Sequence, residues 1–359
     1  MIFREVKMKK ILHHIFIDGL SGMALGLFST LIVGTIVAQI GTLVGGDIGN
    51  ILTSVANVAK GLTGAGIGVG VAYKFKAAPL VTVSAGAAGM VGAFAGSILS
   101  GAAFAGGALV LKGPGEPLGA FIAAYVGIEI GRLISGKTKL DILLTPIITI
   151  FTGAVVGLFV GPPISNVLTA LGDLINWGTE LQPVLMGILV SVIMGMCLTL
   201  PISSAALGII LGLSGIAGGA AVIGCSAQMV GFAVMSYREN KLGGLFAQGI
   251  GTSMLQMPNI VRKPIVWLPP IITSAVLGPV SAKMLGMTCG PVGSGMGTSG
   301  LVGQIVTYQT MVGSGVSAAV TLIQILVMHF IAPAVITLLI SEFMRKKGWI
   351  KPGDLKLDI

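Results

Sequence analysis

The chain has 359 residues, of which 54% are hydrophobic and 9% charged, and its formal net charge is +9. Soluble domains carry about 25% charged residues, and many apolar runs here are long enough to cross a bilayer, so a water-soluble protein is excluded. The positive charge does not point to nucleic acid, because it gathers in short clusters between apolar runs, as in cytoplasmic loops. The sequence therefore predicts an all-α polytopic membrane protein.

The first predicted span follows a basic segment, residues 1–10, which we expect in the cytoplasm. This start resembles a signal peptide only superficially, because no A-x-A site follows a short apolar core and the apolar stretch continues to Ile40. Residues 11–73 allow two spanning helices with a break near the run GGDIGN. Residues 77–131 allow two more, with a break near Gly113.

The remaining spans are expected in the second part of the chain. Residues 140–237 allow four, and residues 264–344 allow two around a glycine-rich outer segment. The stretch 242–261 is too short to cross and return, which predicts a re-entrant hairpin from the cytoplasm. The total is about ten transmembrane helices, with both termini and the tail 344–359 in the cytoplasm.

This orientation depends on the distribution of lysine and arginine, which collect in cytoplasmic loops. Most of the 21 basic residues fall in six clusters, which we place on the cytoplasmic side. The clusters are Arg4, Lys7, Lys9 and Lys10; Lys74 and Lys76; Arg132, Lys137 and Lys139; Arg238 and Lys241; Arg262 and Lys263; and Arg345, Lys346, Lys347, Lys351 and Lys356.

An internal repeat is predicted within a single transmembrane domain, residues 11–343. The run LLTPIIT (Leu143–Thr149) matches WLPPIIT (Trp267–Thr273), and the related halves extend over about 73–203 and 237–343. Transporters are often built from such repeats, with the substrate site where they meet. The first half is longer, and its extra residues include LKGPGEPLGAF (Leu111–Phe121), which we interpret as an insertion.

The 56 glycines allow two interpretations. Glycine lets membrane helices approach closely, and it also permits broken helices and re-entrant loops where these line a cavity. The sequence leaves both open.

Glu116 is the main candidate for a ligand-binding residue, because ionisable residues at membrane depth usually face a cavity. It is flanked by Gly113, Gly115 and Pro117, which interrupt a helix, and the proline is suited to the first turn of the next one. Its carboxylate would accept hydrogen bonds from hydroxyl groups, as recognition of a sugar or polyol requires. The alternative is a solvated outer turn between two helices.

Other ionisable residues could support this site. Lys112 and Lys60 are candidate partners of the Glu116 carboxylate, although Lys60 could instead reach the outer interface by snorkelling. His329 lies well inside the last predicted span and is either a packed, hydrogen-bonded residue or a further ligand contact.

Neutral polar residues are found in the predicted inner hairpin. Gln248, Gln256 and Asn259 offer amide donors and acceptors suited to hydroxylated ligands. On another predicted helix, Glu129 and Arg132 lie three residues apart, which favours a local ion pair.

No catalytic centre is visible in the sequence. Cys197, Cys225 and Cys289 are far apart and form no C-x-x-C pair, so we expect buried structural thiols and neither a metal nor another cofactor. The glycine-rich segment 290–304 lacks the G-K-[ST] of a Walker A motif. At most, the chain would be the membrane component of a multi-protein enzyme.

The motif GPGEPLG, together with the predicted spans and hairpins, resembles the IIC membrane components of bacterial sugar phosphotransferase systems. The whole chain is most similar to the IIC-like family that includes the perfringolysin O regulator. The resemblance implies that Glu116 binds sugar hydroxyls in a homodimer in the bacterial cell membrane. It also implies that separate soluble IIB and IIA proteins supply the phosphoryl group.

The predicted function is therefore a IIC-type permease for a carbohydrate or polyol. Two alternatives remain open: a membrane-bound sensor or regulator of a small molecule without transport, and an ion-coupled secondary transporter. The sensor would bind its ligand without flux, and the ion-coupled transporter would need a proton or sodium gradient but no phosphoryl donor.

Overall fold

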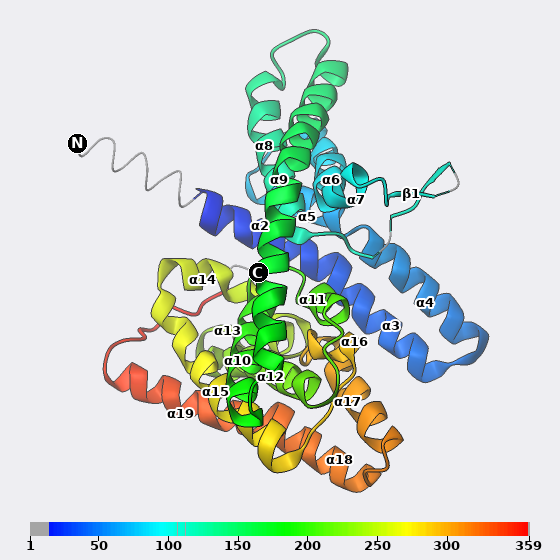
Figure 1. Cartoon of the computed structure of the whole chain (residues 1–359). Coiled ribbons are helices and arrows are strands. Elements are labelled where there is room, and N and C mark those ends of the chain that lie inside the picture. The colour runs from blue at the N-terminus through cyan, green and yellow to red at the C-terminus, as the bar shows by residue number, and fades with distance from the viewer. Residues whose placement is uncertain (1–13, 106, 112, 358–359) are drawn as a thin grey trace. The chain divides into compact units, whose positions relative to one another are not determined.

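The computed structural model describes residues 14–105, 107–111 and 113–357, which are mostly helical with one small β-hairpin (Figure 1). Contacts divide the chain into two compact units. The first unit ends at Val167 and the second begins at Leu168.

Unit 1 contains the elements from the N-terminal helix to the first part of α9, with η denoting π or 3₁₀ turns. They are η1 (His14–Gly19), α2 (Leu20–Leu27), η2 (Phe28–Ile32), α3 (Val33–Val44), α4 (Gly46–Gly61), α5 (Thr63–Lys74), α6 (Pro79–Ala93), α7 (Ala95–Leu99), β1 (Phe104–Ala105), β2 (Ala108–Leu109), α8 (Pro117–Ile134) and α9 (Asp141–Thr179).

The breaks in unit 1 follow glycine and proline. The first long helix ends at Gly45, whose φ of 66° lies in the left-handed region that glycine tolerates. This break falls in the run GGDIGN, where the sequence predicts it. The next two helices, α4 and α5, are bent by 52° relative to each other.

Glycines bring the helices of unit 1 into close contact. Gly26 of α2 lies against the backbone of Gly66 in α5, and Gly92 of α6 lies against Gly119 of α8. A Cβ atom at any of these positions would collide with the facing backbone or side chain. These contacts support the close-packing interpretation of the glycines.

Unit 2 contains the end of α9 and all later elements. They are α10 (Pro183–Thr199), α11 (Ser204–Ile210), α12 (Gly215–Met235), α13 (Tyr237–Phe246), η3 (Ala247–Gly251), η4 (Ser253–Gln256), α14 (Met257–Arg262), η5 (Pro264–Trp267), α15 (Leu268–Pro279), η6 (Val280–Leu285), α16 (Pro291–Ser294), η7 (Ser299–Leu301), α17 (Val302–Gly313), α18 (Ala318–Ile325), η8 (Leu326–Ile331) and α19 (Ala332–Lys346).

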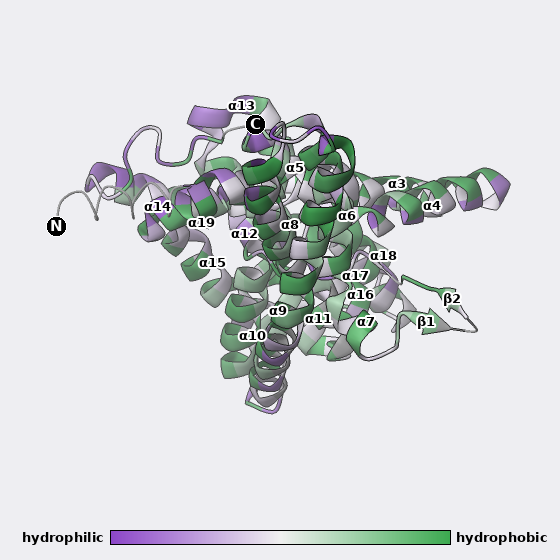
Figure 2. Cartoon of the chain, turned by 90° about the horizontal axis from the view of Figure 1, so that it is seen from above, coloured by the Kyte–Doolittle hydropathy of each residue, from purple (hydrophilic) through white to green (hydrophobic). Residues whose placement is uncertain are grey.

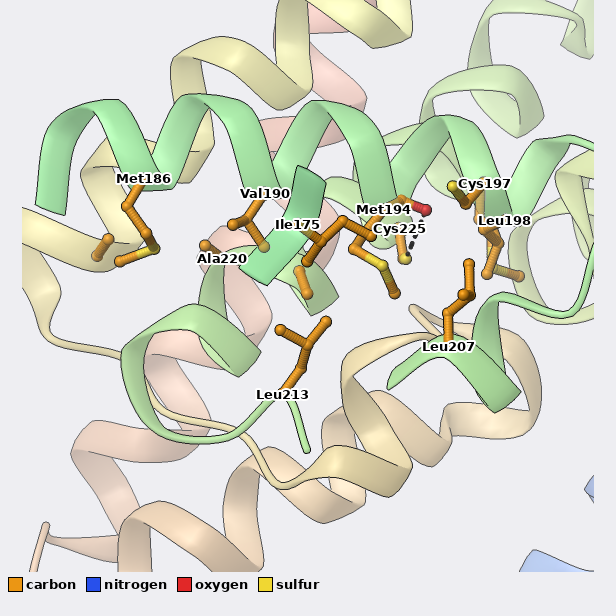
Figure 3. Packing of buried hydrophobic residues seen from close by; sticks show 13 residues of the cluster. Ile175, Met186, Val190, Met194, Cys197, Leu198, Leu207, Leu213, Ala220 and Cys225 are labelled. Atoms are coloured by element: carbon orange, nitrogen blue, oxygen red, sulfur yellow. Dashed lines mark hydrogen bonds between the residues drawn. The ribbon is translucent and has the colours of Figure 1, made fainter. Parts of the chain in front are cut away.

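Helix α12 forms the centre of unit 2. In its most apolar 18-residue window 89% of the residues are buried, and the helix contacts α10, α15 and α19. One face of α10 carries an apolar residue at every fourth position, namely Met186, Val190 and Met194. These residues belong to the same apolar cluster as Cys225 of α12 (Figure 3). All three cysteines are free and buried, as expected.

Six helical segments of the described chain are long and apolar enough to cross a membrane, or seven if the bent pair α4–α5 is one span. The six are Ile17–Val44, Pro117–Ile134, Asp141–Ile164, Gly215–Met235, Pro264–Leu285 and Ala318–Lys346. Shorter apolar helices, α6 and α10, do not reach this length. The chain is thus a multi-pass membrane protein, whereas the expected count of about ten spans is not confirmed.

The stretch predicted as a re-entrant hairpin is a run of short helical turns. It covers the end of α13, then η3, η4 and α14, and every residue from Gly251 to Ile260 is buried. Hydrophilic residues gather at α13, whereas α8 and α10 are mainly hydrophobic (Figure 2). The position of this hairpin relative to a bilayer stays a prediction.

Candidate functional site

Glu116 lies in unit 1 at a helix break, immediately before α8. It is the N-cap residue of that helix, and its backbone N–H donates to the carbonyl of Ala93 at the end of α6, at 2.7 Å. Its carboxylate accepts a hydrogen bond of 3.4 Å from the backbone N–H of Leu118. An acidic side chain at this position is favourable, because it satisfies an otherwise unpaired amide of the helix's first turn.

The glycines before Glu116 fix the path of the chain. Gly113 and Gly115 have φ values of 75° and 72°, in the region that L side chains rarely adopt. A Cβ on Gly115 would lie 2.7 Å from the Cβ of Ala93, so the segment is held tightly against the end of α6. Lys112, the predicted neighbour, lies outside the described residues.

The Glu116 carboxylate has hydrogen-bonding capacity to spare. A carboxylate offers about four lone-pair sites, yet among the described residues this one accepts a single long bond. The residue is half-buried, and a carboxylate removed from water needs donors or a cation. A ligand with several hydroxyl groups would supply such donors.

Lys60 lies in the last turn of α4, near the same end of α6. The next helix begins at Thr63, and a Cβ on Gly64 of that helix would lie 2.9 Å from the Cβ of Ala93. In the described part of the chain Lys60 and Glu116 form no ion pair. The structure therefore places the segment after Lys60 and the segment before Glu116 at the same end of α6, but the two charged groups form no ion pair.

His329 belongs to unit 2, where it is fully buried in the π-helical turn η8. Its Nδ1 lies 2.9 Å from Nε2 of Gln304, and that amide nitrogen is 3.5 Å from the Ser226 hydroxyl. The serine donates to the carbonyl of Val222, so it accepts from Gln304. The amide nitrogen then donates to Nδ1, which places the histidine proton on Nε2.

Several buried polar atoms of unit 2 have no hydrogen-bond partner in the described chain. They include Nε2 of His329, Oε1 of Gln304 and Nε2 of Gln228. Leaving such an atom unpaired costs about 1–3 kcal/mol, so a bound water or ligand group is expected at such positions. Sequence analysis missed Gln304 as a partner of His329, because the two residues lie 25 positions apart.

Gln248, Gln256 and Asn259 are brought together as a buried chain of amides. Gln248 donates to the Ser236 hydroxyl at 2.8 Å, Gln256 donates to Oε1 of Gln248 at 2.8 Å, and Asn259 donates to Oε1 of Gln256 at 2.8 Å. The remaining bonds of Gln256 and Asn259 go to backbone carbonyls of the C-terminal tail. These predicted ligand donors are thus engaged by the chain itself.

The expected local ion pair on α8 is confirmed. The guanidinium Nη1 of Arg132 lies 3.2 Å from Oε1 of Glu129. The structure adds a contact of 3.1 Å between Glu129 and His14, whose ring stacks on Phe75. These residues form a paired cluster, in contrast with Glu116 before the first turn of the same helix.

A pocket of about 420 Å³ lies in unit 2, where α12 meets α13. Its lining includes Tyr237, Leu338 and the pair Arg238–Glu342, whose charged atoms are 3.0 Å apart. None of the described residues that the sequence predicts as ligand contacts lines this pocket. Across the described residues, no group of histidine, cysteine and acidic side chains could hold a metal ion.

Comparison with known proteins gives one family match. The model of the family described as "Phosphotransferase system, EIIC" matches residues 17–357, nearly the whole chain. No curated protein matches the chain.

Proposed function

Since the chain belongs to the EIIC family of the phosphotransferase system, we propose that it translocates a carbohydrate or polyol which a separate IIB protein phosphorylates. The family makes the chain a membrane permease of this system, working with the system's other components. The substrate class and the separate donor are the proposed part. A homodimer in the bacterial cell membrane, with cytoplasmic termini, completes the proposal.

The geometry of Glu116 is the observation that carries the substrate class. Its half-buried carboxylate lies at a helix break and accepts one long hydrogen bond from the described part of the chain. Hydroxyl groups of a ligand would supply further donors. Gly113, Gly115 and Pro117 hold the break open, and Lys112 and Lys60 are the proposed nearby cations. We include Gln248, Asn259 and His329 of unit 2 as further proposed contacts.

Binding to purified protein tests the proposal. A panel of sugars and polyols is first screened for ligands that raise the thermal midpoint, since a ligand that binds the folded state stabilises it. The best ligand is then titrated against Glu116→Gln, which keeps the shape and removes the charge. Losing a charge-assisted hydrogen bond costs about 1.5–3 kcal/mol, which is roughly tenfold to a hundredfold in affinity.

Glu129→Gln is the matched control, because Glu129 belongs to the same helix but is already paired with Arg132. We expect it to bind the ligand as the parent does. Equal affinity of the Glu116→Gln variant and the parent would show that Glu116 is only a residue of an outer turn. Binding without any flux would favour the sensor alternative.

A further inference from the structure

The C-terminal tail, residues 350–357, is seated in unit 2. The chain leaves α19 at Lys346 and turns, and the side chains of Ile350, Leu355 and Leu357 are 2%, 0% and 7% exposed. Lys356, between the two leucines, is exposed. This in–out–in alternation is that of an extended segment with one face against the protein.

Side-chain amides bind the backbone of the tail. Asn240 donates from Nδ2 to the carbonyl of Leu355 at 2.8 Å, and its Oδ1 accepts from the N–H of Leu357 at 2.9 Å. One asparagine therefore pairs the polar backbone groups on both sides of Lys356, as a neighbouring strand would.

Two further amides complete the backbone contacts. Gln256 donates to the carbonyl of Leu355 at 3.1 Å, and Asn259 donates to that of Lys356 at 2.9 Å. These bonds recognise a peptide backbone and not its side chains.

An ion pair and two leucines supply the side-chain specificity. Nζ of Lys263 lies 2.6 Å from Oδ2 of Asp354, and both side chains are less than one-third exposed. The same Asp354 oxygen accepts the backbone N–H of Lys351 at 2.6 Å, which closes the turn before the extended segment. The resulting pattern is Asp-Leu-x-Leu.

We propose that Asn240, Gln256, Asn259 and Lys263 form a binding site for an extended Asp-Leu-x-Leu peptide segment. The chain's own tail is its ligand and holds the segment from α13 to α14, which includes the hairpin 242–261, closed. The site is continuous with the core of unit 2. Gln256 bonds Gln248, which bonds Ser236 at the end of the central helix α12.

A regulatory role for the tail follows from the shared amides and rests on the proposed function. The amides of Gln256 and Asn259 donate to tail carbonyls, and the same donors are those a hydroxylated substrate would use. The tail and such a substrate would therefore compete for this hairpin. Binding of the tail to this site does not require a substrate, so the tail's binding is tested in the absence of one.

The first experiment measures whether the tail latches the hairpin. Ser253→Cys places a thiol at a fully buried position of η4, and the native cysteines are buried and contribute little background. The rate of labelling by a soluble maleimide is measured on three purified proteins. They are Ser253→Cys alone, Ser253→Cys combined with Asp354→Asn, and Ser253→Cys combined with Lys356→Gln. Lys356 is the matched control, because only its backbone contacts the site.

We expect Asp354→Asn to speed labelling about fivefold, the effect of losing about 1 kcal/mol, and Lys356→Gln to leave it unchanged. In a chain truncated after Lys347 labelling should be faster still. The added peptide IKPGDLKL, residues 350–357, should slow it again, and the same peptide with asparagine for aspartate should do so several-fold less well.

Unchanged labelling after truncation would overturn the latch, and protection by both peptides alike would overturn the role of Asp354. Neither readout involves transport or a sugar. A failed transport assay with intact protection would therefore contradict the proposed function alone.

Discussion

Glu116 is a half-buried and Asn259 a buried polar residue, but their hydrogen bonding differs. Asn259 donates to Gln256 and to a tail carbonyl, so both of its amide protons are used. Glu116 accepts one bond of 3.4 Å. A carboxylate with unused lone pairs is suited to an exchangeable ligand, whereas a satisfied amide stabilises one fold.

The pH dependence of the tail should follow Asp354. Burial alone would raise the pKa of its carboxyl. Hydrogen bonds from Lys263 and from the Lys351 backbone, together with the positive charges of these two lysines, outweigh burial and hold the pKa below its usual value. A depressed carboxyl pKa stabilises the seated tail above the ordinary Asp value of about 3.9. This stabilisation is lost as the pH falls through the folded-state pKa.

Hydrogen exchange of residues 350–357, corrected for the intrinsic rate at each pH, measures this effect. Protection should be constant near neutral pH and fall below about pH 3.9. In Asp354→Asn this acid step should be absent. An equal acid step in that variant would assign the titration to another group.

The closest helix contact of unit 2 gives a prediction at a single glycine. A Cβ on Gly224 of α12 would collide with the carbonyl of Ser191 in α10. Gly224→Ala should therefore destabilise the protein by about 1–3 kcal/mol, the usual cost of overpacking. Gly243→Ala is the control, because nothing lies within 4 Å of a Cβ there. A lower thermal midpoint is expected for the first variant only.

At the scale of helices, breaks set by glycine and proline could be predicted from the sequence. Gly45 ends the first long helix, and Pro117 begins α8 directly after Glu116. These breaks depend on local backbone chemistry, which a short stretch of sequence carries.

Features that depend on distant residues could not be predicted in this way. The bond from Gln256 to the tail joins residues 99 positions apart. The expected four spans in residues 140–237 assumed helices of one membrane thickness, whereas α9 is one helix of 39 residues and α10 has only 17. Charge patterns do not determine helix length.

The internal repeat stays a prediction, with one local similarity in its support. Thr149 and Thr273, three residues after Pro146 and Pro270, each donate to the backbone carbonyl four residues earlier, at 2.7 and 2.9 Å. The contact boundary between Val167 and Leu168 differs from the proposed halves, 73–203 and 237–343. An experimental structure in which the two proline segments do not superpose would show that the match is chance composition.

The end of α19 is fixed by a buried ion pair. Arg345 donates to Glu239 at 3.0 Å and to the carbonyl of Met235, and the Arg345 and Glu239 side chains are each 9% exposed. Glu239→Gln leaves Arg345 with only the longer contact to Glu342, at 3.8 Å, so it should cost about 3 kcal/mol, the low end of the cost of breaking a buried pair. Denaturant unfolding of the purified protein in detergent measures this loss in the free energy of unfolding.

The control for this pair is Arg238→Gln, because the Arg238 side chain is 68% exposed in its pair with Glu342. It should change stability by less than about 1 kcal/mol. Adding Arg345→Met to Glu239→Gln should cost less than the sum of the single changes. Strict additivity would contradict coupling between the two charges.

The orientation of the helices is tested with single cysteines. If the basic clusters face the cytoplasm, cysteines at Lys76, Lys137 and Lys241 should resist impermeant thiol reagents in intact cells. A cysteine at Asp47, in the exposed first turn of α4, should be labelled. Labelling at any of the three lysine positions would overturn the predicted topology.

At the scale of the whole molecule, the family match covers residues 17–357 and therefore both units. Among the described residues, Glu116 of unit 1 has spare acceptor capacity, and unit 2 contains buried polar atoms without partners. The proposed substrate class rests on the first of these observations, and the second marks positions where a water or ligand group is expected.

Phosphorylation-coupled uptake tests the central claim most directly. Proteoliposomes containing the purified chain are loaded with phosphoenolpyruvate and the soluble phosphotransferase proteins, and the best-binding sugar or polyol is added outside in radiolabelled form. We predict that the phosphorylated sugar or polyol accumulates inside the vesicles and that omitting phosphoenolpyruvate abolishes this accumulation. Glu116→Gln should reduce the accumulation, whereas Glu129→Gln should not. Accumulation without the donor, or equal accumulation in both variants, would contradict the account.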